Sequence, residues 1–341
     1  MARERRGDRT KLLILGGTLF VGRHIVEAAL DRGHEVTLFN RGRTHAGLFP
    51  GVEELRGDRD VDLDALRGRA WDAVVDPSAR VPRWVRSAGE ILAGAVGHYT
   101  FISSGSVYSP ARPVGYDETA PVHVLRDETV EVISDPETYG ALKVLSERAA
   151  EELMPGRVLS VRAGLVVGPY DPTGRFTYWV HRVAKGGDVV APEPRDQPVQ
   201  FVHARDLADW ILDMAERREA GVFNATGPAE PLTMERLLDE CVAATQSDAH
   251  LVWVDENFLV RHGVEAWSDL PLWLAPAQNP DDANFLTMDV SKARAAGLRF
   301  RPLRETILET LSGAEPVLSA GLSPEREAEL LEAWKARSPS T

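Results

Sequence analysis

Lys11-Leu-Leu-Ile-Leu-Gly-Gly-Thr-Leu-Phe-Val-Gly22 is the stretch from which the architecture of the chain can be predicted. Residues 12–15 form a short apolar run without a polar face, which is typical of a strand buried on both sides of a parallel sheet. Gly16 and Gly17 permit a tight turn, and Gly22 lets the following helix lie close to the strand.

The elements around this turn predict a dinucleotide-binding βαβ unit. A helix is expected at 21–30, ended by Gly33, and a second strand at 34–39. In such a unit the N-terminus of the helix receives a pyrophosphate. The alternative is a glycine-rich turn with a purely structural role. The expected cofactor contacts in the turn are Gly16, Gly17, Thr18, Leu19, Phe20, Val21 and Gly22.

Length and composition place the chain among globular enzymes. Its 341 residues suffice for one large α/β domain with a smaller lobe, and 43% hydrophobic with 27% charged residues is ordinary for a soluble enzyme. No apolar run approaches the roughly 20 residues that span a membrane. The charged N-terminus leads directly into the first strand and does not read as a signal peptide.

Cysteine content, net charge and the histidine pattern bear on the cellular compartment and on the ligands that the protein binds. The single Cys241 excludes an intramolecular disulfide and fits a cytoplasmic protein. A net charge of −13 disfavours non-specific nucleic-acid binding, which depends on phosphate contacts. The scattered histidines contain no metal-binding motif, so no metal is expected.

Strand and helix patterns alternate through the first half of the chain. This order predicts a Rossmann-type, doubly wound parallel sheet with right-handed crossovers. Further strands are expected at 55–58, 71–75, 98–103 and 158–162, with helices at 81–95 and 135–153. The predicted domains are a dinucleotide-binding Rossmann domain at 10–165, a smaller C-terminal substrate-binding lobe at 166–314 with segments returning to the sheet, and a helical extension at 315–341.

Tyr139 and Lys143 are four residues apart and therefore share one face of the predicted helix. A nearby cation favours the phenolate, and we expect Lys143 together with an oxidised nicotinamide ring to lower the tyrosine pKa from about 10 toward 7. Such a tyrosine exchanges a proton with a substrate hydroxyl. Ser104 follows a strand at the sheet edge where ligands bind, and could hold the reacting oxygen. Without the other two features, Tyr-x-x-x-Lys would describe a solvated helical pair.

Several motifs together resemble the extended short-chain dehydrogenases/reductases of the NAD-dependent epimerase/dehydratase group. The resemblance covers about residues 11–312 and includes the segments 16–22, 104–108, 139–143, 162–169 and 200–206. It implies that Ser104, Tyr139 and Lys143 form a catalytic triad and that Lys143 also touches the nicotinamide ribose. It further implies that Asp58 contacts the adenine and that the helices at 81–95 and 135–154 pair in a homodimer.

Leu19 occupies a position where the family more often has a glycine. This variant resembles a subset that includes plastid stem-loop RNA-binding relatives. The sequence therefore predicts an NAD(P)-dependent enzyme acting at a carbinol or ketone carbon, either a nucleotide-sugar epimerase or a ketone reductase. The alternative is a non-catalytic or RNA-binding relative, against which the complete triad and the acidic composition argue.

The residues after the second strand bear on the choice of cofactor. An acidic residue there would hold the ribose 2′-hydroxyl of NAD, whereas an arginine favours the 2′-phosphate of NADP. This chain has Asn40, Arg41 and Arg43, which favours NADP over NAD. The alternative is that both arginines are solvated loop charges.

The substrate lobe offers fewer signals. Ser106, Arg175, His203 and Arg205 are candidate substrate-binding residues, and the last three might hold an anionic group such as a nucleotide diphosphate. The alternative is that each is a surface or fold-supporting residue. By the resemblance, sugar 4,6-dehydratases carry an Asp-Glu pair where this chain has Gly105 and Ser106, so that activity is not expected.

Overall fold

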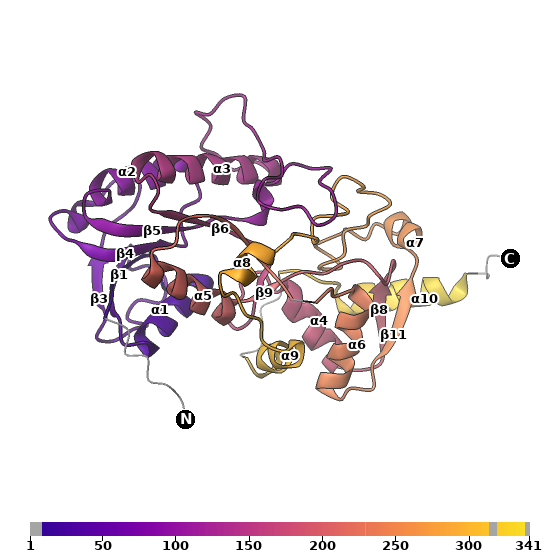
Figure 1. Ribbon diagram of the computed structural model, residues 1–341. Helices are drawn as coiled ribbons and strands as arrows, with labels where there is room; N and C mark the ends of the chain where they lie inside the picture. The colour runs from indigo at the N-terminus through magenta and orange to yellow at the C-terminus, as the bar shows by residue number, and fades with distance from the viewer. Residues whose placement is uncertain (1–8, 229, 314–318, 338–341) are drawn as a thin grey trace.

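A seven-stranded parallel sheet forms one half of the molecule (Figure 1). The computed structural model describes residues 9–228, 230–313 and 319–337. The strand order is β3-β2-β1-β4-β5-β6-β10, which confirms the doubly wound sheet predicted from the sequence. The strands are β1 (Lys11–Leu15), β2 (Glu35–Asn40), β3 (Glu53–Arg56), β4 (Trp71–Asp76), β5 (Val96–Ile102), β6 (Val158–Ala163) and β10 (Gly221–Ala225).

Helices cover both faces of this sheet (Figure 1). Apolar side chains of α1 and α5 pack on one face, and those of α2 and α3 on the other. Both faces of each central strand are therefore buried, which explains the continuous apolar run at 12–15. The helices are α1 (Phe20–Asp31), α2 (Pro82–Leu92), α3 (Pro136–Leu153) and α5 (Ala204–Arg217), with short 3-10 turns η1 (Asp64–Leu66) and η2 (Gly105–Val107).

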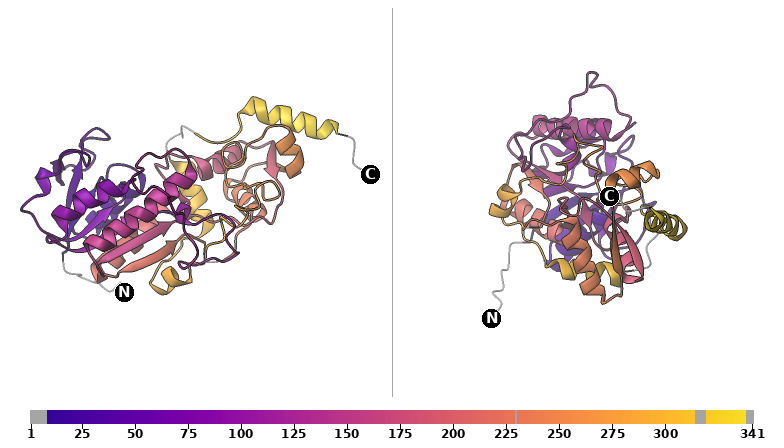
Figure 2. Two further views of the ribbon diagram at one scale, coloured as in Figure 1. Left: turned by 90° about the horizontal axis from the view of Figure 1, so that it is seen from above. Right: turned by 90° about the vertical axis from the view of Figure 1, so that its right-hand side faces the viewer.

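The second half is a smaller lobe beside the carboxyl edge of the sheet, and α10 lies along its outer side (Figure 2). Its own hydrophobic core contains the buried Trp179 and Trp273. The predicted boundary at 314–315 lies outside the described residues. The lobe's elements are α4 (Arg175–Ala184), α6 (Met234–Thr245), α7 (Glu256–Arg261), α9 (Leu303–Ser312), α10 (Pro324–Ala336) and the strands β8 (Asp188–Pro192) and β11 (His250–Val254).

Three short elements join the two halves. β7 (Val166–Val167) pairs with β9 (Val202–His203), and α8 (Ser291–Ala295) contacts β10. The Gln200 side chain bonds to the backbone of Met288 in both directions. These contacts tie the returning strand β10 and its neighbours to the lobe.

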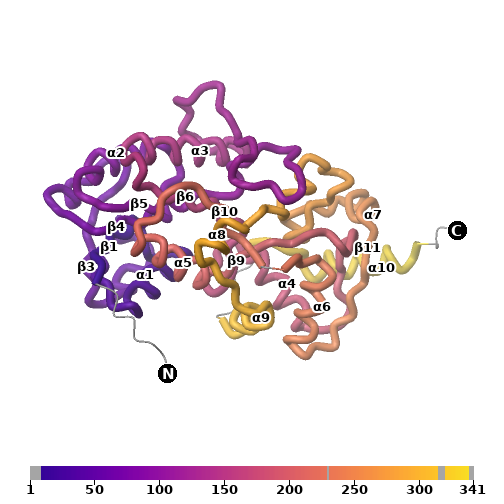
Figure 3. Tube along the Cα trace, viewed as in Figure 1, coloured from indigo at the N-terminus to yellow at the C-terminus, as the bar shows by residue number. Residues whose placement is uncertain are grey.

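The segment between η2 and α3 runs over the outer face of α3 (Figure 3). Its Leu125 packs against Leu142 and Leu145 of that helix, and its Glu131 accepts a hydrogen bond from Arg83 of α2 at 2.7 Å. Part of the face expected to pair in a homodimer is thus covered within one chain. The homodimer stays a prediction. Within the described ranges, no helix has the length and apolar character that crossing a membrane requires.

Candidate active site

The glycine-rich turn leaves β1 with an unusual backbone that only glycine adopts without strain. Gly16 and Gly17 have φ values of +120° and +90°. A Cβ on Gly17 would lie 2.9 Å from Leu38 Cδ2, and one on Gly22 would lie 3.1 Å from the backbone of Gly17. The α1 helix starts at Phe20 after Leu19, which provides no side-chain cap, so its first N–H groups face the turn.

A pocket of about 360 Å³ opens beside this turn. Its backbone cradle and the N-terminus of α1 fit a pyrophosphate, and its three arginines with high exposure, Arg41, Arg43 and Arg80, fit further negative charge. We call it the cofactor pocket. Its lining residues are Gly16, Thr18, Leu19, Phe39, Asn40, Arg41, Gly42, Arg43, Thr44, Gly57, Asp58, Arg59, Ser78, Arg80 and Trp84.

The residues predicted to select the cofactor gather at one end of this pocket. The Asn40 Oδ1 accepts hydrogen bonds from the backbone N–H of Gly42 and from Arg56. Arg41 is half exposed and lies 3.9 Å from Asp58, a distance that leaves its donors available to a ligand. Asp58 accepts a hydrogen bond from the backbone N–H of Asp60 and lines the pocket, and its contact with adenine stays a prediction.

A buried ion pair that the sequence analysis missed forms the floor of the cofactor pocket. Arg59 donates to both oxygens of Asp76 at 2.6 and 2.5 Å and to Ser78 Oγ at 2.9 Å. Tyr99 also donates to Asp76, and the charge of Arg59 holds the carboxyl pKa of Asp76 below its usual value against the cost of burial. A carboxylate directly after the apolar run 73–75 of strand β4 was the available signal.

Lys143 lies beneath the catalytic edge of the sheet. Its Nζ donates to the carbonyl oxygens of Ala79 and Ile102 at 2.9 and 2.6 Å and lies 4.1 Å from the ring centre of Phe101. Burial lowers the pKa of this ammonium to about 7. The side chain is therefore only partly charged at neutral pH.

Tyr139 lies close enough to Ser104 for the two side chains to interact. Burial raises the pKa of the Tyr139 phenol, and the Ser104 side chain and the charge of Arg80 oppose that shift. In the protein alone the shift is thus opposite to the one expected from Lys143 together with an oxidised nicotinamide, and the effect of both together stays a prediction. Lys143 is half neutralised and held by carbonyl groups, and the cation that acts on Tyr139 is Arg80.

Gly140 explains how Tyr139 reaches Ser104. A Cβ at this position would lie only 2.0 Å from the carbonyl oxygen of Ser106. The missing side chain lets α3 approach η2 closely. The N-terminus of α3 is fixed by Asp135, whose side chain accepts the backbone N–H of Thr138 at 2.7 Å.

A second buried hydrogen-bond network, which the sequence analysis also missed, joins α3 to the ends of β5 and β6 next to Ser104. Glu147 lies one turn after Lys143 on α3 and accepts hydrogen bonds from Arg162 of β6 and from Ser103, the residue before Ser104. The Arg162 and Glu147 side chains are 7% and 8% exposed. The spacing from Lys143 to Glu147 was a signal in the sequence that would have placed both on one helix face.

A second pocket, of about 390 Å³, lies between the sheet and the smaller lobe next to the N-terminus of α3. We call it the inter-lobe pocket. Ser106, one of the predicted substrate residues, lines it together with several aromatic side chains, and its role stays a prediction. It is lined by Ser106, Tyr108, Pro110, Arg112, His123, Pro136, Glu137, Ala266, Trp267, Trp273, Leu274, Asn279, Asp282 and Phe285.

The other three predicted substrate residues do not line this pocket. His203 is buried as the N-cap of α5, and burial lowers its pKa to about 3. Arg205 pairs with Glu309 at 2.7 Å, on the side of the sheet covered by α1 and α5. Arg175 stands over the ring of Trp267 at 5.2 Å, one layer outside the pocket lining. The fold-supporting alternative thus describes His203 and Arg205 well.

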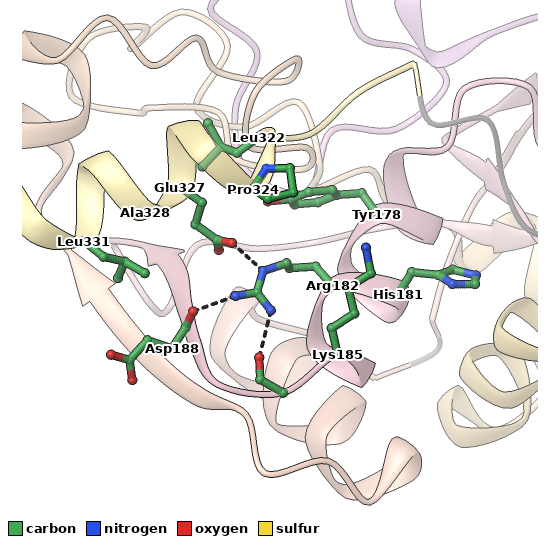
Figure 4. Close-up of a pocket in the computed structure, with 11 residues that line it drawn as sticks. Tyr178, His181, Arg182, Lys185, Asp188, Leu322, Pro324, Glu327, Ala328 and Leu331 are labelled. Atoms are coloured by element: carbon green, nitrogen blue, oxygen red, sulfur yellow. Dashed lines mark hydrogen bonds and ion pairs between the residues drawn. The ribbon is translucent and has the colours of Figure 1, made fainter.

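A third pocket, of about 540 Å³, lies between α4 and α10 and shares no residue with the other two (Figure 4). Arg182 points into it and contacts Glu327 and the carbonyl oxygen of Asp188 (Figure 4). Glu327 also accepts the backbone N–H of Val190. These contacts fasten α10 to the lobe rather than form a reaction site.

Comparison with protein families identifies one match. Residues 79–226 match the model of the NAD dependent epimerase/dehydratase family. That range contains Ser104, Tyr139 and Lys143.

Two curated proteins are similar to this chain at 27% and 28% sequence identity. A chloroplast stem-loop binding protein of 41 kDa from Arabidopsis thaliana is 27% identical over 252 residues, which is 69% of this chain and 63% of that protein. A 2-alkyl-3-oxoalkanoate reductase from Stenotrophomonas maltophilia is 28% identical over 173 residues, 47% of this chain and 52% of that protein. The chain thus spans less than two thirds of the length of either relative.

Solved structures share the fold over most of the chain. The Bordetella bronchiseptica enzyme WbmG in complex with NAD has a TM-score of 0.66 at 19% identity, covering 91% of this chain and 95% of that one. A Thermus thermophilus UDP-glucose 4-epimerase complex with NAD has a TM-score of 0.59 at 20% identity, covering 89% of this chain and 100% of that one.

Proposed function

We propose that this chain, whose residues 79–226 match the NAD dependent epimerase/dehydratase family, is a member of that family and an NAD(P)-dependent oxidoreductase acting at a carbinol or ketone carbon. The observation that carries the proposal is the position of Tyr139. It interacts with Ser104 at the sheet edge where ligands bind, and its helix begins beside the inter-lobe pocket. Its neighbour Arg80 lines the cofactor pocket.

The cofactor, when bound, supplies or accepts the hydride. Tyr139 carries the matching proton. Because burial raises its pKa, the phenol is protonated at neutral pH and can donate to a carbonyl oxygen as the carbonyl carbon gains hydride. The carbonyl double bond is reduced to a carbinol, and the phenolate left behind faces the charge of Arg80 before it takes a proton from solvent.

Ser104 and Lys143 have supporting roles in this proposal. The Ser104 hydroxyl lies within hydrogen-bonding reach of Tyr139 and would hold the reacting oxygen in the same place. Lys143 fixes the edge through the carbonyl groups of Ala79 and Ile102, and in its protonated form a third N–H bond remains for a ribose hydroxyl.

We further propose that NADP(H) is preferred to NAD(H). Arg41 and Arg43 follow Asn40 at the end of β2, and both line the cofactor pocket. Asn40 carries no charge that would repel a 2′-phosphate, and Asp58 lies near Arg41 at 3.9 Å, so its charge is partly balanced.

The test of the proposed function is Tyr139→Phe in the full chain. Turnover of a carbonyl probe, acetophenone with NADPH, should fall by at least about a hundredfold, the usual contribution of a general acid, while NADPH affinity stays unchanged. Tyr178→Phe is the matched control, because Tyr178 lies in the third pocket. UDP-glucose with NADP serves as the probe of epimerisation.

Near-normal turnover by Tyr139→Phe would remove the assigned role. If the wild-type protein converted neither probe but retained RNA in a filter-binding assay, the non-catalytic alternative would replace the proposal.

A further inference from the structure

The inter-lobe pocket has a wall of rigid aromatic side chains. The rings of Trp267 and Phe285 meet edge to face, with centroids 5.8 Å apart and planes at 83°. Trp273 is fully buried behind them, and its indole N–H donates to the carbonyl oxygen of Glu193 at 3.1 Å. These contacts fix the rings before any ligand arrives.

The backbone of this wall is held in a costly conformation. Trp267, Leu272 and Ala275 have φ values of +67°, +69° and +48°. Non-glycine residues rarely adopt this left-handed region, and such residues cluster at ligand-binding sites. Of the three, Trp267 lines the pocket.

The one strong cation of the pocket is already neutralised. Arg112 donates to Asp282 at 2.6 Å and to the carbonyl oxygens of Tyr108 and Ser109 at 3.0 and 2.7 Å. Its side chain is only 4% exposed, and both of its terminal nitrogens are engaged within the protein. Arg112 therefore holds the pocket together and is not available for a phosphate.

The remaining ionisable groups give the pocket no positive charge at neutral pH. Burial lowers the pKa of His123, which keeps that ring neutral. Glu137 is exposed at the start of α3 and carries a negative charge that faces His123. Among the described lining residues, Arg112 and His123 are the only ones that can be cationic. A diphosphate would meet an uncompensated carboxylate and no free donor cation.

From this geometry we infer that the pocket binds an uncharged substrate with a flat apolar ring, whose ketone group points to Tyr139. The inference rests on the proposed function and narrows it to ketone reduction, because nucleotide sugars carry a diphosphate. A volume of about 390 Å³ lies within the usual range for small-molecule sites. The ring would lie against Trp267 and Phe285.

Arg175 supplies the competing hypothesis. Its guanidinium stacks on the outer side of Trp267, and its Nε is buried without a partner. Burial lowers its pKa, which shows that its charge is poorly compensated. An anionic substrate that displaced Trp267 would reach this arginine, so a substitution there separates the two substrate classes.

The experiment measures binding rather than turnover. Full-length protein saturated with NADP⁺ is titrated with acetophenone and, separately, with UDP, by saturation-transfer NMR. Acetophenone should bind, Trp267→Ala should weaken it about tenfold, and UDP should show no saturable binding. Trp334→Ala is the matched control, because Trp334 packs on Phe258 away from the pocket. Arg175→Ala should leave acetophenone binding unchanged.

Three results would overturn the inference: saturable UDP binding that Arg175→Ala weakens, acetophenone binding that Trp267→Ala leaves unchanged, or no acetophenone binding. If circular dichroism shows that Trp267→Ala does not fold, Phe285→Leu replaces it. The proposed function fails separately, through normal turnover of Tyr139→Phe, and acetophenone binding still decides the inference. Conversion of UDP-glucose to a stereoisomer would uphold the proposed function and refute the inference.

Discussion

The cofactor pocket and the inter-lobe pocket differ in the charges that they present to a ligand. The cofactor pocket presents Arg41, Arg43 and Arg80 with high exposure, beside a glycine turn and a helix N-terminus. In the inter-lobe pocket the single arginine is 4% exposed and paired, and aromatic rings form the wall. The first suits a polyanion and the second suits a neutral molecule. The contrast suggests that this site separates a charged cofactor from an uncharged substrate through its two pockets.

The largest effect should come from removing charge where it is exposed. In the variant Arg41→Ala with Arg43→Ala, NADPH affinity should fall about a hundredfold. Each lost hydrogen bond to a charged group is worth at least about 1.5 kcal/mol, and about 1.4 kcal/mol is a tenfold change. NADH affinity should stay within about twofold. Calorimetric titration with both cofactors measures this.

Arg182→Ala is unsuitable as a control because that residue fastens α10, so Arg195→Ala, on the smaller lobe, is used instead. Equal loss of NADH and NADPH affinity would show that the arginines hold the shared diphosphate and do not select the cofactor. The difference in charge between the two pockets would still hold, but the proposed preference for NADP(H) would be wrong.

The two pockets also differ in how far the sequence predicts them. The glycine turn, α1 and β2 are consecutive in the chain, so apolar runs and turn residues predicted them together, and the sheet order is confirmed. The aromatic wall comes from about residue 267 to 285 and meets Arg112 across 170 residues. No local pattern connects Arg112 with Asp282. Pairings of this kind depend on the packing of the two lobes.

Electrostatic environments were harder to predict than positions. The spacing of Tyr139 and Lys143 placed both on one helix face, but the depth of burial decided their pKa values. Depth follows from Gly140 and from the carbonyl groups around Lys143, which lie 41 and 64 residues away. Buried ion pairs such as Arg59–Asp76 were not predicted for the same reason.

The next largest effect is the pH dependence of stability that the buried Lys143 produces. Its pKa is near 7 in the folded state and near 10.4 when unfolded, so the unfolded chain binds the extra proton between these values. The free energy of unfolding therefore rises with pH above 7. Relative to Lys143→Met, wild-type protein should gain up to about 1.4 kcal/mol from pH 7 to 8. Urea unfolding of both proteins without cofactor measures the difference.

In this comparison Lys185→Met is the control, because Lys185 is exposed and should show the same pH dependence as wild-type protein. A difference between wild type and Lys143→Met that stayed constant from pH 7 to 9 would mean that Lys143 remains protonated. Lys143 would then carry a full positive charge, and the description of the Tyr139 pKa would have to include that charge beside the charge of Arg80.

The smallest effect should come from Glu137, the exposed carboxylate at the mouth of the inter-lobe pocket. Glu137→Gln should leave turnover of acetophenone within about twofold, because an uncharged ring and ketone gain or lose little from a nearby charge. The free energy of unfolding should fall by about 0.3–1 kcal/mol, because a negative charge in the first turn favours the α3 dipole. Steady-state kinetics and urea unfolding provide the two values. Asp127→Asn is the control, as this carboxylate is exposed in the segment before α3.

The result for Glu137 also bears on elimination chemistry. Gly105 and Ser106 supply no carboxyl group, Asp117 is engaged by Thr119, and Glu118 accepts the backbone N–H of Asn224. Two carboxylates line the inter-lobe pocket with Ser106; Asp282 is paired with Arg112, which leaves Glu137. A hundredfold loss of turnover in Glu137→Gln would show that Glu137 acts as an acid or base. The argument against a dehydratase activity would then no longer hold. Unchanged turnover would leave Tyr139 as the proton donor in a pocket built for neutral molecules.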